Sequence, residues 1–572
     1  MMNDSRTRPR RAALCALVGS IAAGCAADAE RFPPHSPLWR DPDRAPFSAS
    51  LTEYESPVRW SALDQSVTRP VSQFLAVNPG GEARNVNAWD EVPDSSWFQN
   101  RIGRDPLTAD AAALGPCELR LLDGSGPWTI VSAKVEGATA GFVIEAPGGE
   151  RYLIKFDDGQ GPRATLADVV ASRLYWAAGF DVPCYNIVYF DRSILALGPH
   201  AHGKNAYGEH VPLSWTGVDA ALSRAIRLPD GRFRSVASLY LEGRPLGPWR
   251  YHGTRDGDRN DIIPHEDRRE LRASRLLAAW TDHSDQREGN TLSMWIETSP
   301  GMGFVRHHLL DFGDCFGHFW VGPAELAWRR EHVYFFDPWQ LLGDFATLGV
   351  REQPWDHARL GSLGSVFGYY GVDGFNPEAW RPGYPNPAFG RMTERDGAWL
   401  ARIIARFDEA QLAAIVAMAE VDSALSDALL ATLAGRRQKI LERYLTRLSP
   451  LADPLIRSVG KQLLVCAHDL AVTASVASAT RTYWARVRQP GTDQPLSSVP
   501  VTLDAPGEPC VALPAAAAAS SGRPLATVIE VGVVPSAERS EASLPAPLRL
   551  HLYLDGEHAL IAGIERPRHP AR

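Results

Sequence analysis

Short runs of alternating hydrophobic and polar residues begin at Trp128 and predict β-structure. Three such runs, Trp128–Lys134, Gly141–Glu145 and Tyr152–Phe156, are separated by glycine-containing turns. Alternation with period two places successive side chains on opposite faces of a strand, and glycine favours tight turns. The pattern predicts a small antiparallel sheet, with further strands at Tyr185–Phe190 and Phe233–Glu242.

Apolar residues with the period of an α-helix follow in several longer segments. Thr165–Ala178 carries Leu and Val at this spacing, with Thr165 expected as its N-cap and Gly179 at its end. Pro264–Trp280 shows the same pattern, and Asp396–Leu445 contains three further helical segments. The predicted strands and helices together describe an α+β chain.

A hairpin and a carboxy-terminal β-region complete the pattern. Leu292–Ile296 and Phe304–Leu310 predict two paired strands. His307 and His308 are adjacent on the second strand, so one is expected to face the core and the other solvent. Beyond residue 460 charged residues become scarce and alternating runs recur, which predicts a small β-sandwich.

The composition describes a folded protein of more than one domain. At 572 residues the chain exceeds what one core usually holds, and 45% of its residues are hydrophobic. Its formal charge of −8 argues against a nucleic-acid partner. The scattered cysteines predict no disulfide framework, although Cys466 and Cys510 share one region and can pair in an oxidising compartment. Cys315 is expected to be a buried thiol.

The amino terminus has the form of an export signal. Four arginines precede the short apolar segment Ala12–Ala23, and Cys25 follows it closely. The residues before Cys25 resemble the bacterial lipobox, which implies lipidation of this cysteine and an exported, membrane-anchored lipoprotein on the periplasmic or outer-membrane face. The alternative is an ordinary signal that is cleaved after Ala23 or Ala27.

Three polar residues near the predicted hairpin have the types and order that phosphoryl transfer requires. Asp285 and Asn290 stand five positions apart before the hairpin, and Asp311 begins an Asp-Phe-Gly triplet directly after it. Phosphoryl transfer needs an acidic group for the proton of the attacking hydroxyl and oxygen ligands for Mg²⁺. A loop, a hairpin and a second loop would bring these three side chains to one cleft.

At these residues the chain resembles the protein-kinase-like superfamily, and especially its HipA toxin kinases, CotH spore-coat kinases and phosphoinositide kinases. The resemblance implies bound ATP and Mg²⁺. Asp285 would be the catalytic base, Asn290 and Asp311 would be the metal ligands, and Lys155 on the third predicted strand would contact the phosphates. The sequence names no acceptor.

Further cofactor-binding residues are implied by the same resemblance. Gly137 and Gly141 lie in the first turn, where backbone N–H groups would cover the phosphates, although a plain hairpin turn accounts for them equally well. Asp168 stands where the family has a glutamate that pairs with Lys155, and Asp157 or Asp158 could serve instead. An exposed position on an edge strand is the alternative for Lys155.

The resemblance implies a two-lobed fold with a small antiparallel β lobe and a larger helical lobe, followed by an all-β domain. The expected parts are a lipoprotein signal peptide at 1–24, an extended Trp- and Pro-rich arm at 25–124, a kinase-like amino-terminal lobe at 125–195, a kinase-like carboxy-terminal lobe with insertions at 196–455, and a β-sandwich-like domain at 460–572. The competing interpretation is an α+β protein whose acidic loops only cap helices and turns.

Two functions follow from this pattern. The first is a membrane-anchored kinase-like enzyme that binds Mg-nucleotide and transfers a phosphoryl or nucleotidyl group to an acceptor. The second is a catalytically inactive lipoprotein of the same fold that serves as an extracytoplasmic binding or scaffolding module. The export signal favours the second, because no standing ATP pool exists outside the cytoplasm, whereas the complete residue set favours the first.

Overall fold

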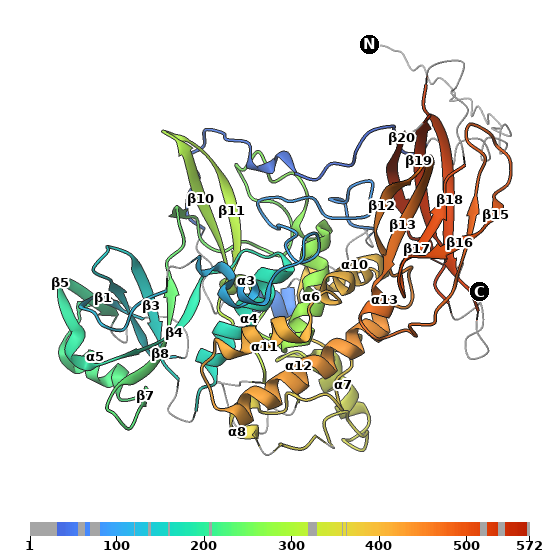
Figure 1. The fold of residues 1–572 in the computed structure, drawn as a ribbon. Helices are drawn as coiled ribbons and strands as arrows, with labels where there is room; N and C mark the ends of the chain where they lie inside the picture. The colour runs from blue at the N-terminus through green and yellow to red at the C-terminus, as the bar shows by residue number, and fades with distance from the viewer. Residues whose placement is uncertain are drawn as a thin grey trace, which may run out of the picture.

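The computed structural model contains several β-sheets and a central group of helices (Figure 1). The structure describes residues 31–54, 63–68, 81–118, 121–134, 139–157, 161–204, 209–317, 329–356, 358–361, 363–514, 523–535, 544–556 and 558–568. In this part of the chain, no helix has the length and apolar character needed to cross a membrane. The mixed α and β composition agrees with the prediction.

The first β-region is an eight-stranded sheet (Figure 1). Its strands are β1 Trp128–Ala133, β2 Gly141–Glu145, β3 Arg151–Lys155, β4 Tyr185–Phe190, β5 Leu195–Lys204, β6 His210–Pro212, β7 Ile226–Arg227 and β8 Phe233–Leu239. The order is β4-β8-β3-β2-β1-β5-β6, with β7 beside β8 and only the β1–β5 pair parallel. The three antiparallel strands predicted at the start of this region are confirmed.

Helix α4, Ala164–Ala178, follows β3 and is almost wholly buried. Its predicted start is wrong, because Arg163 occupies the N-cap position. Thr165 lies inside the helix and donates its hydroxyl to Asp157 Oδ2 at 2.6 Å. The predicted end at Gly179 is confirmed: its φ is +125°, and a Cβ there would lie 2.2 Å from the Phe98 ring. Only glycine fits both constraints.

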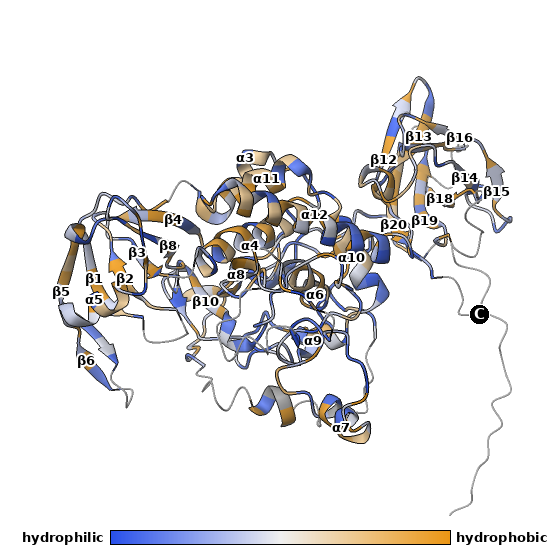
Figure 2. Cartoon of the chain, turned by 90° about the horizontal axis from the view of Figure 1, so that it is seen from below, coloured by the Kyte–Doolittle hydropathy of each residue, from blue (hydrophilic) through white to orange (hydrophobic). Residues whose placement is uncertain are grey.

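The helices beyond the first sheet pack side by side between the two β-regions (Figure 2). The helices outside α4 are α3 Ala109–Leu114, α5 Trp215–Leu222, α6 Arg269–Thr281, α7 Pro338–Ala346, α8 Gly364–Phe367, α9 Pro387–Gly390, α10 Glu394–Ile404, α11 Glu409–Ala417, α12 Ser423–Tyr444 and α13 Leu470–Thr473. Short helical turns are η2 Pro42–Arg44, η3 Asp64–Thr68, η4 Gly115–Cys117, η5 Arg192–Ile194, η6 His265–Asp267 and η7 Glu288–Asn290. Buried residues of α4, α6, α10, α11 and α12 share one hydrophobic core.

The predicted hairpin is present next to this core. It consists of β10, Thr291–Ser299, and β11, Met302–Leu309, with the short strand β9, Arg244–Pro245, beside β10. Both His307 and His308 are buried, so the prediction that one faces solvent is wrong. The reason is that residues from the amino-terminal arm cover the second face, where His307 stacks on Trp97 with ring centroids 3.4 Å apart.

The carboxy-terminal strands form a four-stranded and a five-stranded antiparallel sheet. They are β12 Leu451–Val459, β13 Gln462–Asp469, β14 Tyr483–Val487, β15 Ser497–Val499, β16 Val501–Leu503, β17 Pro509–Ala512, β18 Leu525–Val533, β19 Leu548–Asp555 and β20 His558–Glu565. Buried side chains of both sheets meet in one cluster, which includes Val465 and Leu550. The division of the chain into domains remains a prediction.

Two disulfides link residues that are distant in sequence. Cys466 pairs with Cys510 across β13 and β17, as the shared region allowed. Cys117 pairs with Cys184, a disulfide that the scattered positions of the cysteines did not predict. Cys315 has a free, buried thiol, as predicted.

The amino-terminal arm is fastened to the body by a buried ion cluster at Asp181. Arg101 of the arm donates to Asp181 Oδ1 at 2.9 Å, and Arg306 of β11 donates to both carboxylate oxygens at 2.7 and 2.9 Å. Burial would raise the pKa of the Asp181 carboxyl, but the two arginines outweigh burial and lower this pKa below its usual range. One carboxylate thus joins the arm, the α4–β4 loop and the hairpin.

Replacing Asp181→Asn is expected to lower the free energy of unfolding by about 3 kcal/mol, because two partly buried guanidinium groups lose their anionic partner. Urea unfolding followed by tryptophan fluorescence measures the change. The matched control is Asp219→Asn, which breaks the exposed pair with Arg192 and should cost less than about 1 kcal/mol. Equal losses in the two variants would contradict the structural role of Asp181.

Candidate functional site

Lys155 lies at the end of β3 and points its amine into a cluster of acids. The side-chain nitrogen is 3.2 Å from Asp168 Oδ2 and 2.8 Å from Asp311 Oδ1. Lys155 is only 5% exposed, which excludes the alternative of an exposed edge position. A buried ammonium group is stable only when it is paired, and here α4 and the end of the hairpin supply the two partners.

The two carboxylates around this amine differ in pKa because burial dominates at Asp168 and the charge of Lys155 dominates at Asp311. Burial raises the pKa of Asp168 to about 6, although Lys155 acts in the opposite direction. The side chain of Asp311 is 49% exposed, and the charge of Lys155 lowers its pKa to about 2. For the amine itself, burial would lower the pKa, but the two carboxylates outweigh burial and raise it well above its usual value. At neutral pH Lys155 is charged and Asp311 is ionised.

Asp311 and Asn290 lie at the same end of the β10–β11 hairpin. Thr291 pairs with Leu309, and one step further the backbone N–H of Leu310 donates to Asn290 O at 2.9 Å. Asp311 follows with a φ of +57°, a conformation that non-glycine residues adopt rarely and that is common at functional sites. The hairpin thus presents an ionised carboxylate and an amide near each other.

Asp285 and Asn290 are joined within one loop. Asn290 Nδ2 donates to Asp285 Oδ2 at 2.9 Å and to Asp285 O at 2.8 Å, and Arg287 Nε donates to Asp285 Oδ1 at 3.0 Å. Burial raises the pKa of Asp285 to about 6, and the charges of Asp314 and Asp311 act in the same direction. The carboxylate therefore gains and loses its proton close to neutral pH, which suits a general base.

Asp314 holds the loop that contains Asp285. Its Oδ2 accepts the backbone N–H of Asp285 at 2.8 Å and the hydroxyl of Ser284 at 3.0 Å. Arg330 lies against the same acid, donates to the backbone oxygens of Asp314 and Asp282, and forms an ion pair with the Asp282 carboxylate at 2.5 Å. These contacts tie the loop, the segment after the Asp-Phe-Gly triplet and the end of α6 together.

The sequence interpretation did not anticipate Asp314 and Arg330. The spacing of Asp314, three positions after Asp311, was the only signal for it. Arg330 lies 45 positions after Asp285, and no periodicity connects the two. Arg330 places a guanidinium group beside the loop, with its Nη2 3.5 Å from Asp314 Oδ2.

His283 supports the loop as a neutral ring. Burial lowers its pKa to about 4, so the imidazole is uncharged at neutral pH. The ring packs against Phe312 of the triplet with centroids 5.2 Å apart, and Nδ1 lies 3.2 Å from the hydroxyl of Tyr175 on α4. The loop, the triplet and α4 are therefore in direct contact.

The other predicted site residues fall into two groups. Gly141 is the first residue of β2 and lies so close to β3 that a Cβ would be 2.1 Å from Ile154 O, which accounts for glycine by strand packing. Asp157 pairs with Arg234 at 3.4 Å and does not serve as the partner of Lys155. Gly137, Asp158 and the predicted lipidation residue Cys25 lie outside the described residues.

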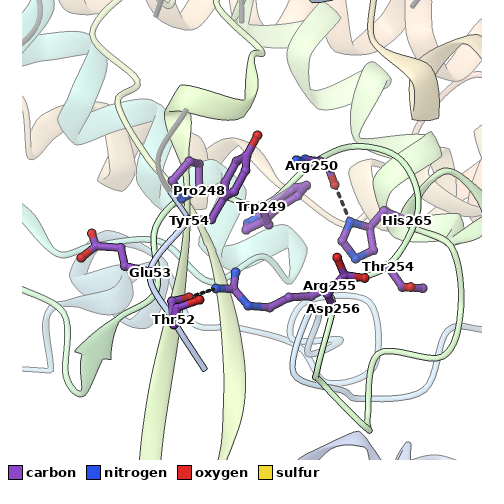
Figure 3. A pocket seen from close by; sticks show the side chains of 10 residues that line it. All are labelled: Thr52, Glu53, Tyr54, Pro248, Trp249, Arg250, Thr254, Arg255, Asp256 and His265. Atoms are coloured by element: carbon purple, nitrogen blue, oxygen red, sulfur yellow. Dashed lines mark hydrogen bonds between the residues drawn. The ribbon is translucent and has the colours of Figure 1, made fainter. Parts of the chain in front are cut away.

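A cavity of about 210 Å³ lies between arm residues 52–54 and the loop after β9 (Figure 3). Two of its polar side chains, Arg255 and His265, bond to the protein itself. Arg255 donates to Thr52 O at 3.1 Å, and His265 bonds to Arg250 O and, at 2.7 Å, to Asp261. None of the predicted site residues lines this cavity, which is a joint between the arm and the body.

Comparison with known proteins gives little guidance. No family model and no curated protein matches the chain. Among solved structures, the chain shows weak similarity to the crystal structure of the Golgi casein kinase and to that of the same kinase with Mn/ADP bound. Each comparison has 10% identity and a TM-score of 0.21, and covers 55% of this chain and 75% of the solved one. Similarity this low supports no inference about fold or function.

Replacing Lys155→Met is expected to lower the free energy of unfolding by about 3 kcal/mol, because the buried carboxylate of Asp168 loses its cation. Urea unfolding measures the change. The control is Lys461→Met on the exposed turn after β12, expected to alter stability by less than about 0.5 kcal/mol. If both variants unfold alike, the Lys155 amine contributes nothing to holding the cluster together.

Proposed function

We propose that the chain is a two-lobed, kinase-like phosphotransferase that binds a Mg-nucleotide between its first sheet and its helical region. The observation that carries the proposal is the position of Lys155, whose amine lies within 3.2 Å of both Asp168 and Asp311. Asp311 is 156 positions away in sequence from Lys155, and the loop of Asp285 bonds to Asp314, three residues after Asp311. Proteins that transfer phosphoryl groups need such a set in one cleft.

Lys155 would bind the phosphates. Its ammonium group is charged and already lies against the half-exposed carboxylate of Asp311. A nucleotide that enters from the exposed side of Asp311 would give the amine a phosphate oxygen as a partner, while Asp168 keeps the amine in place from the buried side. Gly137 stands between β1 and β2 in the sequence, and its backbone N–H would add a phosphate contact.

The donor set fits Mg²⁺. Asp311 is ionised and half-exposed, and the amide nitrogen of Asn290 is used by Asp285, which leaves the amide oxygen for a cation. Carboxylate and amide oxygens are the hard ligands that Mg²⁺ prefers. When bound, the metal neutralises phosphate charge and orients the triphosphate.

Asp285 would act as the base in transfer. The acceptor hydroxyl gives its proton to the Asp285 carboxylate as its oxygen bonds to the γ-phosphorus, and the bond from that phosphorus to the nucleoside diphosphate breaks. Arg287 and Asn290 hold the carboxylate through one oxygen each, so its direction is set before the acceptor binds. Transfer of the nucleoside monophosphate group would use the same residues.

We also propose that the chain works outside the cytoplasm, anchored through a lipid on Cys25, with a separate β-sandwich-like domain at 460–572. The two disulfides support an oxidising compartment. This location also keeps the second function open, in which the same fold binds partners without catalysis. Nucleotide binding separates the two.

Replacing Asp311→Ala is expected to abolish Mg²⁺-dependent ATP binding in isothermal titration calorimetry, because the charged metal ligand is lost. The parent chain should bind Mg-ATP and melt at a higher temperature with it, since a ligand that binds only the folded state raises stability. Asp219→Ala, which removes an exposed acid on α5, serves as the matched control and should bind like the parent. Unchanged binding by Asp311→Ala would remove the metal assignment, and a parent that binds no nucleotide would favour the non-catalytic function.

Transfer of labelled phosphate from ATP to the chain itself is expected to depend on an ionised Asp285. Because burial raises its pKa to about 6, the base is lost as pH falls through this value, and the rate should drop about tenfold per pH unit below it. Asp285→Asn should lower the rate at least about a hundredfold and leave nucleotide binding intact. A transfer rate that does not change between pH 5 and pH 7 would contradict the assignment of Asp285 as the base. An active Asp285→Asn variant would contradict it as well.

A further inference from the structure

Large hydrophobic side chains are concentrated on the surface of one short segment. Among the described residues, seven of the eighteen exposed large hydrophobic side chains lie between residues 335 and 350. Phe345, Leu348 and Val350 are the most exposed, at 80%, 86% and 85%. The rest are Phe335, Phe336, Leu341 and Leu342. An apolar concentration of this kind on a soluble surface marks an interaction site.

Helix α7, which forms the centre of this segment, presents the reverse of the usual amphipathic arrangement. Its polar residues bond to the protein: Asp344 Oδ1 accepts from Gln340 Nε2 at 2.9 Å and from Gln353 Nε2 at 2.8 Å. Its apolar residues, including Phe345, face solvent. A surface helix normally buries its apolar side, so α7 is held with that side available to a partner.

The hydrophobic segment is joined to the candidate catalytic loop. The backbone N–H of Phe335 donates to Gly383 O at 2.7 Å, and its ring contacts Tyr384 with centroids 5.1 Å apart. The backbone N–H of Gly383 in turn donates to Ser284 O at 2.8 Å, next to Asp285. The amino-terminal end of this segment, at Phe335, is thus connected through Gly383 to the residue that precedes the proposed base.

We propose that residues 335–350 form a docking surface for an apolar, amphipathic segment of a protein acceptor. The inference rests on the proposed function and names its acceptor class as protein. Docked hydrophobic side chains would hold the acceptor while its hydroxyl reaches Asp285. Aromatic and aliphatic side chains that lose their contact with water on binding supply most of the affinity at such surfaces.

The exposure of the surface favours a protein over an isolated lipid. Phe345 and Leu348 are at least four-fifths exposed, so their side chains project into solvent. An acyl chain bound to such side chains would leave one of its sides in water. A protein segment can cover them with its own hydrophobic residues and face water with its polar ones. Figures 1 and 2 both show α7 at the periphery of the helical region.

The position of the chain start argues against a bilayer as the occupant. Tyr553 on β19 donates its hydroxyl to Phe32 O at 2.7 Å, so the described chain begins beside the carboxy-terminal sheets. Cys25, the proposed lipid anchor, precedes Phe32 by seven positions, a reach of no more than about 25 Å. The strands β19 and β20 lie well apart from α7 in both views (Figures 1 and 2), so an anchored membrane would adjoin the other end of the molecule.

Binding of a labelled peptide tests the docking surface without any catalytic step. The probe is a fluorescein-labelled amphipathic peptide with Leu and Phe on one helical face and a serine at one end, measured by anisotropy without nucleotide. The double variant Phe345→Ser, Leu348→Ser is expected to bind at least about tenfold more weakly than the parent. The matched control, Val459→Ser with Leu503→Ser, replaces two exposed apolar residues of the carboxy-terminal strands and should bind like the parent.

The remaining outcomes decide between occupants. Equal binding by parent and double variant, or equal binding of a scrambled peptide, overturns the proposal. The proposal is also overturned if the parent forms a dimer that the double variant does not form. Sedimentation of the parent, but not of the double variant, with phosphatidylcholine vesicles would overturn it as well. Asp285→Asn should bind the peptide normally. With Mg-ATP, the serine of the bound peptide should be phosphorylated, with a higher KM in the double variant and the same kcat. Specific peptide binding without transfer, in a chain that binds Mg-ATP and labels itself, overturns the acceptor role and leaves the proposed function standing.

Discussion

A charged amine that is almost completely buried must be neutralised where it lies, and the Lys155 amine imposes this requirement on three parts of the fold. The amine forms an ion pair with Asp168 of α4 and another with Asp311 at the end of the β10–β11 hairpin. Both elements are thereby linked to the first sheet. Asp168 also accepts the backbone N–H of Phe312 at 3.0 Å, so the two acids are linked to each other as well as to the lysine. The sheet, the helix and the hairpin meet at the Lys155 amine, and the loop of Asp285 contacts the residues after Asp311 through Phe312 and Asp314.

The acids of this site are not equivalent, and exposure separates their roles. Asp168 has no access to water and holds Lys155 from the protein side. Asp311 is ionised and half-exposed, so it can exchange the lysine for another cation at little cost in desolvation. Asp285 and Asp314 both have their pKa raised to about 6 by burial, which places proton exchange near neutral pH beside a fixed positive charge. Asp311 forms an ion pair with the permanently charged Lys155, and its own charge contributes to the raised pKa of Asp285.

Local elements could be predicted from the sequence because hydrophobic period and turn residues report them directly. The strands around β2, the hairpin and the helices after residue 394 were all visible in this way. The meeting of Lys155 with Asp311 could be anticipated only from their order along the chain. Contacts made by residues without periodicity could not: the Cys117–Cys184 disulfide, Arg330 beside Asp314 and the covering of His307 by Trp97 depend on how distant segments cross. The prediction of Thr165 as the N-cap was wrong because this residue lies inside the helix and donates its hydroxyl to Asp157.

The amino-terminal arm, which covers one face of the β10–β11 hairpin, also affects the order in which the chain can fold. Asn85 reaches Glu270, Asp90 pairs with Arg269 at 2.7 Å, and Glu91 accepts from Arg402 at 2.8 Å, across separations of 179 to 311 positions. Because chain entropy must be lost before such distant contacts form, folding dominated by them is slow. The arm can therefore reach its native position only after most of the polypeptide has been synthesised. The contacts of the arm with Arg269, Glu270 and Arg402 can form only after these residues have been synthesised.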